Sequence, residues 1–428
     1  MNKLNRKETP AIKDPIHYSF QLKPYTHYLL ANGIPVYSIH AGSQEVLQIE
    51  LVYSAGNCFE KKKGLAAATN FLLKNGTSTL NAFQLNEAFE YYGAYCNRSC
   101  YNETAMITLH TLSKHVVKML PLLKVMLSDS LFLPEELEIY KQNSKQRLKV
   151  NKQKADFVAT RLIDSYIYGS EHPYGVYTEP EDLDAITVED CRQFYNDHYL
   201  KGHCKIFVCG NLPDNMSLML NEVFGKLQNV ISPLALPDMQ ATPAQEKKYR
   251  IENDPKAVQG AIRIASPFPN RHHPDFQKVI VLNTLFGGFF GSRLMSNIRE
   301  IKGYTYGIYS YLQNHLQQSA WVISTEAGKK VCEATINEVY LEMKALRENT
   351  IEEEELLLVR NYMLGNILGE LDGPFHLMAK WKNILLNNLD ENYFYDSVET
   401  IKTVTATELQ TLAVKYMQPE LFYELVVY

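Results

Sequence analysis

The sequence predicts an α+β protein made of two duplicated domains, each a mostly antiparallel sheet packed with helices, in a clamshell-like arrangement. Three observations indicate this fold. The chain has 428 residues, more than one hydrophobic core usually serves. The order of expected strands and helices in the second half repeats that of the first. Residues 187–210 and 405–428 also end alike: Thr, an acid three residues on, an aromatic near the helix end, and an apolar strand.

The first half opens with strands and continues mostly with helices. Residues 27–42 contain two apolar runs joined by Asn32-Gly33, a dipeptide typical of hairpin turns. Residues 46–56 alternate as a third strand. Apolar spacing predicts the other elements: helices over 64–77 and 81–93 (ending at Gly93), a strand over 104–112, helices over 114–129, 134–150, 155–168 and 187–199, a strand over 204–212 and a helix to Leu227.

A proline-containing, aperiodic stretch separates the halves and predicts the domain boundaries. We place an N-terminal domain at 1–230, a linker at 231–249 and a C-terminal domain at 250–428. The second half then repeats the order of strands and helices found in the first. It is expected to contain a strand over 258–268, helices over 273–286 and 291–302, two strands within 304–325, helices over 330–348, 352–370 and 374–388, and a final helix and strand over 405–428.

Composition excludes several classes of protein. The net charge of −5, with both signs interspersed, gives no basic face for nucleic acid. The most apolar run, 116–127, is about half a bilayer span and is broken by lysines and a proline, so no membrane span is expected. The polar N-terminus has no signal-peptide core, which predicts a cytoplasmic protein, with a periplasmic one as the alternative if a leader was removed. Seven scattered cysteines without a CxxC pair predict reduced thiols.

Residues 64–77, GLAAATNFLLKNGT, have the frame of a metallopeptidase helix without its chemistry. In H-x-x-E-H, two histidines bind zinc from one helix face and the glutamate acts as general base. The stretch resembles this motif of the pitrilysin/insulinase family of zinc metallopeptidases, which includes the mitochondrial processing peptidase and small bacterial two-subunit peptidases. The matching frame positions are Gly64, Leu65, Ala66, Leu72, Gly76 and Thr77.

Other residues stand at the chemical positions of that motif. The resemblance places the histidines at Ala67 and Phe71, which cannot ligate zinc. It places the glutamate at Asn70, whose amide cannot act as a base near pH 7. The family's third ligand is a glutamate about 75 residues further on. Residues 140–154 contain no acid, and Gln146 is the nearest candidate. We therefore expect no zinc cofactor in this chain.

A glycine-rich segment in the second half carries the other candidate site. Three glycines predict a turn between two helices, and Gly303 suits a left-handed cap at the end of the second helix. Arg299 lies in the last turn of that helix, and Tyr304 and Tyr306 are expected on one face of the following strand. The segment lacks the lysine of a P-loop, which argues against nucleotide binding.

The resemblance assigns a role to Arg299 and Tyr306. In this family the half without zinc supplies an Arg and a Tyr seven residues apart, which face the zinc helix of the other half. There they hydrogen-bond the substrate carbonyl or its oxyanion, and a cation with an O–H donor suits that task. A structural role is the alternative, because the helix dipole favours Arg near a C-terminus and Tyr is common in half-buried strands.

Three functional hypotheses follow. In the first, the chain is the catalytically incomplete subunit of a heterodimeric peptidase, inactive alone. A homologous partner with an intact H-x-x-E-H supplies the zinc, and an unfolded peptide adds to a sheet edge. In the second, the chain is a structural or peptide-binding scaffold. The third, a peptidase with rearranged ligands, is disfavoured because no second helix carries His and Glu at ligand spacing. We favour the first.

Overall fold

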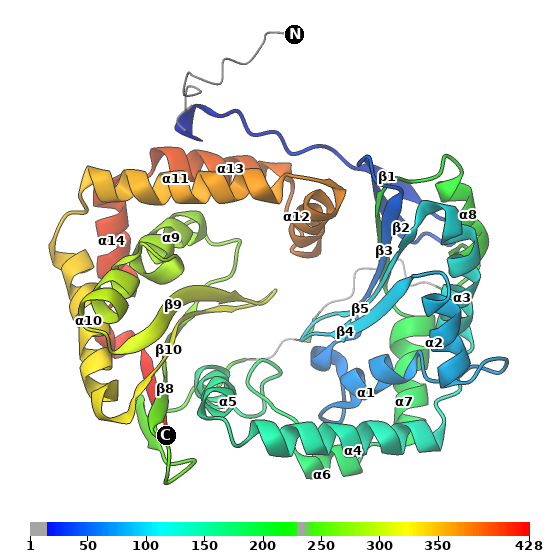
Figure 1. The fold of residues 1–428 in the computed structure, drawn as a ribbon, viewed down its shortest axis with the longest axis horizontal. Coiled ribbons are helices and arrows are strands. Elements are labelled where there is room, and N and C mark those ends of the chain that lie inside the picture. The colour runs from blue at the N-terminus through cyan, green and yellow to red at the C-terminus, as the bar shows by residue number, and fades with distance from the viewer. Residues whose placement is uncertain (1–14, 229–235, 238–239) are drawn as a thin grey trace.

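A computed structural model describes residues 15–228, 236–237 and 240–428, and its strands form two sheets (Figure 1). The first sheet has six strands in the order β1-β2-β6-β3-β5-β4, and the second has five in the order β7-β11-β8-β10-β9. The strands are β1 (Thr26–Leu29), β2 (Pro35–His40), β3 (Val46–Tyr53), β4 (Tyr95–Cys100), β5 (Ala105–Leu112), β6 (Cys204–Gly210), β7 (Lys248–Ile251), β8 (Gln259–Phe268), β9 (Thr305–Asn314), β10 (Ser319–Gly328) and β11 (Tyr423–Val427).

Helices surround the two sheets (Figure 1). The α-helices are α1 (Leu65–Leu72), α2 (Ala82–Glu90), α3 (Val116–Ser128), α4 (Pro134–Asn151), α5 (Ala155–Tyr168), α6 (Pro180–Asp184), α7 (Val188–Tyr195), α8 (Met216–Phe224), α9 (Phe276–Asn283), α10 (Cys332–Glu348), α11 (Glu353–Glu370), α12 (Pro374–Leu386), α13 (Glu391–Thr403) and α14 (Ala406–Tyr416). Short 3-10 turns are η1 (Pro15–His17), η2 (Asn57–Phe59), η3 (Ser113–His115), η7 (Lys329–Val331) and η8 (Pro419–Leu421), and wider π-helical turns are η4 (Asn196–Leu200), η5 (Thr284–Gly288) and η6 (Met295–Ile301).

The two sheets share one pairing pattern. In the first sheet β2 pairs parallel with β6, and in the second β7 pairs parallel with β11. The remaining pairs of both sheets are antiparallel. The predicted fold class, α+β with two sheets of repeated order packed with helices, is therefore confirmed.

Each half gives one helix to the other. In the first half, strands β4 and β5 are followed by helices α3, α4 and α5. In the second half, strands β9 and β10 are followed by helices α10, α11 and α12. The third helix of each set, α5 or α12, is the one that packs on the other half. Helix α5 packs on β8 and β11, where its Ile163 and Ile167 join Ala261 and Leu425 in one hydrophobic cluster. Helix α12 packs in return on β2 and β6 of the first sheet. Strands β6, β8 and β11, which these helices cover, are therefore buried on both faces along almost their whole length.

The segment before β1 also ties the halves together. Phe20 and Leu22 are buried in the cluster formed mainly by the second half. Trp381 Nε1 on α12 donates a hydrogen bond to the carbonyl of Lys23 at 2.8 Å. In Figure 1 this segment runs from α11 and α13 across to β1.

Several elements differ from expectation. The edge strand β4 is polar and β7 is short, so apolar periodicity did not indicate either of them. Helix α13 was also missed, although Phe394, Val398 and Ile401 are buried on one face at helical spacing. The predicted linker at 231–249 lies partly outside the described residues, and its end overlaps β7, which begins at Lys248. The boundaries 1–230 and 250–428 stay a prediction. All seven cysteines are free, and no described helix is both long and apolar enough to cross a bilayer.

Candidate functional site

Helix α1, which carries the degenerate motif, begins at a defined cap. Gly64 precedes it with φ 85°, a conformation that favours glycine. The Glu60 carboxylate accepts hydrogen bonds from the backbone N–H groups of Gly64 and Ala66, both at 2.9 Å. Burial raises the pKa of Glu60 to about 7, while these N–H donors oppose the rise. The frame of the motif therefore has a structural use that does not require zinc.

The residues at the three motif positions are committed to packing. The Nδ2 of Asn70, which is 3% exposed, donates to Tyr199 Oη at 3.1 Å. The ring of Phe71 lies 5.0 Å from that of Tyr140 on α4, centroid to centroid. Ala67 offers only a methyl group. An amide already used as a donor, an aromatic ring and a methyl group are not a zinc-binding set.

The guanidinium of Arg98 occupies the space beside Phe71, one of the motif positions. Arg98 of β4 lies over the Phe71 ring, with its Cζ 5.0 Å from the centroid, and donates to the Phe71 carbonyl. It also donates to Asn75 Oδ1 at 3.0 Å. A half-buried guanidinium here would repel a divalent cation. Zinc therefore does not fit, and the described residues contain no group of three or more His, Cys, Asp or Glu able to hold a metal.

Gln146, the nearest candidate for the third ligand position, lies on α4 and is exposed. The α4 side chain that contacts Phe71 is Tyr140, six residues earlier. Burial raises the pKa of the Tyr140 phenol to about 12, so it stays protonated at neutral pH.

In the second half, the segment that carries Arg299 is held to two neighbouring helices, by an ion pair to α11 and by amide hydrogen bonds to α10. Arg293 Nε and Nη2 bind the Glu355 carboxylate of α11 at 2.7 and 2.8 Å. Asn297 Nδ2 donates to Glu338 at 3.0 Å and to Glu342 at 2.8 Å, both on α10. Because η6 is fixed on one side, Arg299 on its last turn has a defined direction.

Arg299 lies between two aromatic rings. Its Cζ is 4.6 Å from the ring centroid of Phe290 and 5.6 Å from that of Tyr306. Phe290 is 57% exposed and Tyr306 is 93% exposed. No acidic side chain in the described part of the chain forms an ion pair with Arg299. The structure thus brings the two residues selected by spacing together, and leaves the cation and the phenol O–H open to a ligand.

A β-bulge turns Tyr306 outward. Ala327 of β10 faces Thr305, and Thr325 faces Ile308, so two residues of β9 oppose one of β10 between them. Strict alternation would have placed Tyr306 on the buried face with Ile308. Tyr304, by contrast, precedes β9 and packs partly buried against the core. The expectation that Tyr304 and Tyr306 share one face is therefore wrong.

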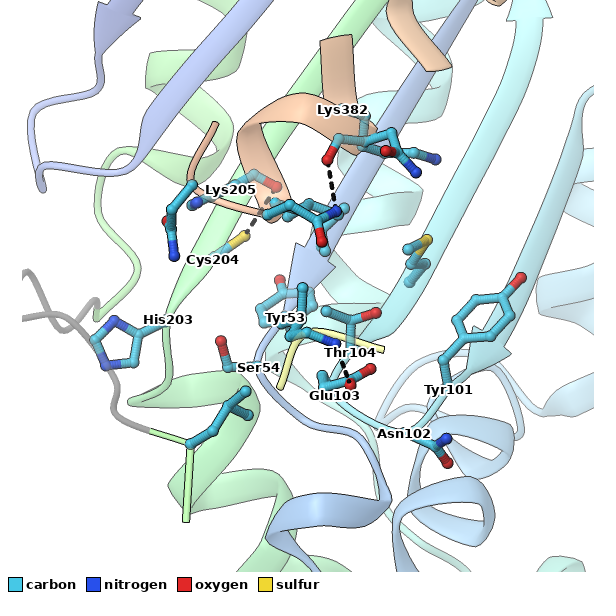
Figure 2. A pocket seen from close by; sticks show the side chains of 18 of the residues that line it. Tyr53, Ser54, Tyr101, Asn102, Glu103, Thr104, His203, Cys204, Lys205 and Lys382 are labelled. Atoms are coloured by element: carbon cyan, nitrogen blue, oxygen red, sulfur yellow. Dashed lines mark hydrogen bonds between the residues drawn. The ribbon is translucent and has the colours of Figure 1, made fainter. Parts of the chain in front are cut away.

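A cavity of about 1220 Å³ lies between the halves, at the end of the first sheet (Figure 2). Glu103 Oε1 accepts from Tyr174 Oη at 2.6 Å and from the backbone N–H of Leu316, at the tip of the β9–β10 hairpin, at 3.0 Å. Lys205 Nζ donates to the carbonyl of Leu385 at 3.4 Å, and burial lowers its pKa. The contacts from Glu103 to Leu316 and from Lys205 to Leu385 connect the two halves of the chain. Neither Arg299, Tyr306 nor the α1 positions line this cavity.

The two sequence-predicted clusters lie on different halves. Helix α1 packs beside β4, an edge strand of the first sheet (Figure 1). The π-helical turn η6, which carries Arg299, packs against β9, an edge strand of the second sheet. Sequence reasoning missed Phe290 and Arg98. The adjacent phenylalanines of GGFFG were a possible signal for the first, whereas nothing in the polar sequence of β4 marked the second.

The chain resembles known proteins over most of its length. It matches the family descriptions "Insulinase (Peptidase family M16)" over residues 35–174 and "Peptidase M16 inactive domain" over residues 185–363. It is 23% identical to "Uncharacterized zinc protease YmxG" of Bacillus subtilis, over 84% of this chain and 88% of that protein. It is 22% identical to "Non-peptidase homolog YmxG" of Helicobacter pylori, over 74% of each chain.

Solved structures share the fold. The peptidase M16 inactive domain from Pseudomonas fluorescens superposes with a TM-score of 0.84 at 20% identity, covering 94% of this chain and 98% of that one. A protease from Helicobacter pylori gives a TM-score of 0.85 at 17% identity, covering 95% of this chain and 100% of that one.

Proposed function

Because the chain belongs to the peptidase M16 (insulinase) family, we propose that it is the catalytically incomplete subunit of a two-subunit metallopeptidase. In this proposal a homologous partner with an intact H-x-x-E-H provides the zinc site. This chain provides Arg299 and Tyr306, and together the subunits hydrolyse unfolded peptide.

One observation carries the proposal. The Arg299 guanidinium and Tyr306 phenol lie together on the surface, and the described residues give the guanidinium no carboxylate partner. A fixed cation beside an O–H donor suits a carbonyl oxygen that gains negative charge during peptide hydrolysis. The motif positions of α1, Ala67, Asn70 and Phe71, offer no zinc ligand and no base for the rest of that chemistry, so the pair would act on a site in another chain.

A scaffold without catalytic role is the second candidate, supported by the names of two relatives. One is a "Non-peptidase homolog" and another, from Bacillus subtilis, a "Probable inactive metalloprotease". In that case Arg299 and Tyr306 would be dispensable.

The test is reconstitution with a co-purified partner that carries H-x-x-E-H. The chain alone should bind no stoichiometric zinc and cleave no peptide, and the complex should do both. Arg299→Ala should lower kcat by about 10²–10³, the usual cost of removing one oxyanion donor, with unchanged affinity between subunits. Arg147→Ala, at an exposed arginine on α4, is the matched control. Robust cleavage by the isolated chain, or full activity of the Arg299→Ala complex, would refute the proposal.

A further inference from the structure

The cavity between the halves has no part in the proposed peptidase role, because neither Arg299 nor Tyr306 lines it. Its volume of about 1220 Å³ is large enough for an organic molecule of moderate size. Side chains of β3, β5 and β6 form one wall, and α12 with the residues that follow it forms another. The cavity lies within one chain, so a ligand bound there would need no partner subunit.

One lysine in this cavity has no counter-ion. Lys205 of β6 is half-buried, and its Nζ donates one hydrogen bond, of 3.4 Å, to the carbonyl of Leu385. No carboxylate of the described chain forms an ion pair with it. Lys382, which lines the same cavity, binds both oxygens of Glu50 at 2.9 and 2.7 Å. Burial lowers the pKa of Lys205, and no acid among the described residues raises it in return.

The groups around Lys205 compensate its charge only in part. Leu385 lies in the last turn of α12, where the helix end carries about half a negative charge, and the bond is longer than usual. Glu103, an acid that lines the cavity, already accepts from Tyr174 Oη at 2.6 Å and from the Leu316 N–H at 3.0 Å. The Lys205 ammonium therefore uses one of its three N–H donors and keeps much of its charge.

Two more donors lie on the same face of the sheet. The backbone N–H of Ser54 donates to the carbonyl of His203 at 3.2 Å, which continues the pairing in which Val52 faces Lys205. Side chains two residues apart share a face, so Ser54, His203 and Lys205 lie on one side of the sheet (Figure 2). Neither the Ser54 hydroxyl nor the His203 ring has a hydrogen-bond partner in the described chain, and neither is sealed from solvent.

Apolar side chains continue this face away from the donors. Val52 faces Lys205 across the β3–β6 pair, and Met106 faces Val52 across the β3–β5 pair. Leu386 adds an apolar side chain from α12. The strands β3, β5 and β6 are interior strands, and their backbone groups are already used in the sheet. A peptide would therefore find no backbone partners on this wall, whereas an aliphatic chain needs none.

We propose that this cavity binds a small organic acid with an apolar body, its carboxylate at Lys205, His203 and Ser54 and its body against Val52 and Met106. An ammonium with N–H and O–H donors beside it forms charge-assisted hydrogen bonds to a carboxylate. A single lysine suits one negative charge better than the two of a phosphate. Water would satisfy the donors, but it would leave the charge of Lys205 uncompensated in a partly desolvated cavity.

The test is isothermal titration calorimetry on the full-length chain with octanoate, octanamide and acetate. Octanoate should bind. Octanamide has the same chain without the charge and should bind at least about tenfold more weakly. Acetate has the charge without the chain and should also bind at least about tenfold more weakly. No binding of octanoate, or equal binding of octanoate and either other probe, would overturn the proposal.

Variants assign the binding to this cavity. Lys205→Met should weaken octanoate binding at least about tenfold, whereas Lys205→Arg, which keeps the charge, should weaken it by no more than about threefold. Lys201→Met, at an exposed lysine outside the cavity, is the matched control and should leave the affinity unchanged. Met106→Ser should weaken octanoate binding several-fold. If Lys205→Met is not folded by circular dichroism, Met106→Ser decides: an unchanged affinity in that variant contradicts the proposed placement.

Discussion

The exchanged helix α12 is fixed to the first sheet by an ion pair whose loss should be costly. Lys382 Nζ binds both oxygens of Glu50, in the middle of β3, at 2.9 and 2.7 Å. The two side chains are only 18% and 9% exposed. Thr108 Oγ1 donates the other hydrogen bond to Glu50, at 3.1 Å. Replacing Lys382 by Met keeps most of the side-chain volume and leaves the Glu50 carboxylate without a counter-ion.

The magnitude follows from the geometry. At 2.7 Å and an effective dielectric constant of 20, the attraction is about 6 kcal/mol, and the desolvation of both ions offsets most of it. Removing one partner keeps the cost of burying the other, which is about 3–5 kcal/mol for a buried pair. Because Thr108 still donates to Glu50, we expect Lys382→Met to lower the free energy of unfolding by about 3 kcal/mol. Glu50→Leu combined with Lys382→Met should recover most of that loss.

Urea unfolding at pH 7 measures these differences, followed by circular dichroism and by tryptophan fluorescence, because Trp381 neighbours Lys382 on α12. The matched control is Lys380→Met on the same helix, whose partner Glu370 is 53% exposed and whose loss should cost less than about 1 kcal/mol. The reasoning fails if Lys382→Met lowers the free energy of unfolding no more than Lys380→Met does. It also fails if the loss in the double variant equals the sum of the losses measured for Glu50→Leu alone and Lys382→Met alone.

Three further outcomes are expected. Burial raises the pKa of Asp164 to about 6, so the folded state favours the protonated form, and the contribution of Asp164 to the free energy of unfolding should fall as the pH rises from 4 through 6. The free energy of unfolding of Asp164→Asn, measured by urea titration, should rise by about 2–3 kcal/mol relative to that of the wild type between pH 4 and pH 6. If the difference between the two proteins does not change with pH, this expectation is contradicted. Phe290→Leu should lower kcat of the reconstituted complex about two- to fivefold without changing subunit affinity, since a cation–π contact at an exposed site contributes about 0.5–1 kcal/mol; an unchanged kcat would remove Phe290 from the site. Tyr199→Phe should cost about 1–2 kcal/mol by urea unfolding, because buried Asn70 loses its acceptor, and a neutral effect would show that another acceptor replaces it.

The exchange of helices also limits what sequence boundaries can mean. Helix α5 belongs to the first half by sequence, yet it covers the second sheet. A cut between residues 230 and 250 would therefore expose apolar faces of both products: α5 would lose its sheet, and the first sheet would lose α12. Amphipathic spacing shows that one side of a helix is buried, but it does not say against which sheet.

At the candidate site, the part that depends on residue identity could be predicted. Ala67 and Phe71 cannot bind zinc in any surroundings, and Asn70 cannot act as the base. The seven-residue spacing also selected Arg299 and Tyr306 as a pair, which lie together in the structure. The position of Tyr306 could not be predicted, since it depends on a bulge between two paired strands.

The sequence by itself determined the class of fold, the repeated order of its elements and the absence of metal ligands from α1, because periodicity and side-chain chemistry are local properties. Only the tertiary structure decided which sheet each exchanged helix covers and that Arg98 occupies the space beside Phe71. Those facts depend on contacts between residues far apart in the chain, and the free energy of such contacts is set by where the folded chain places them.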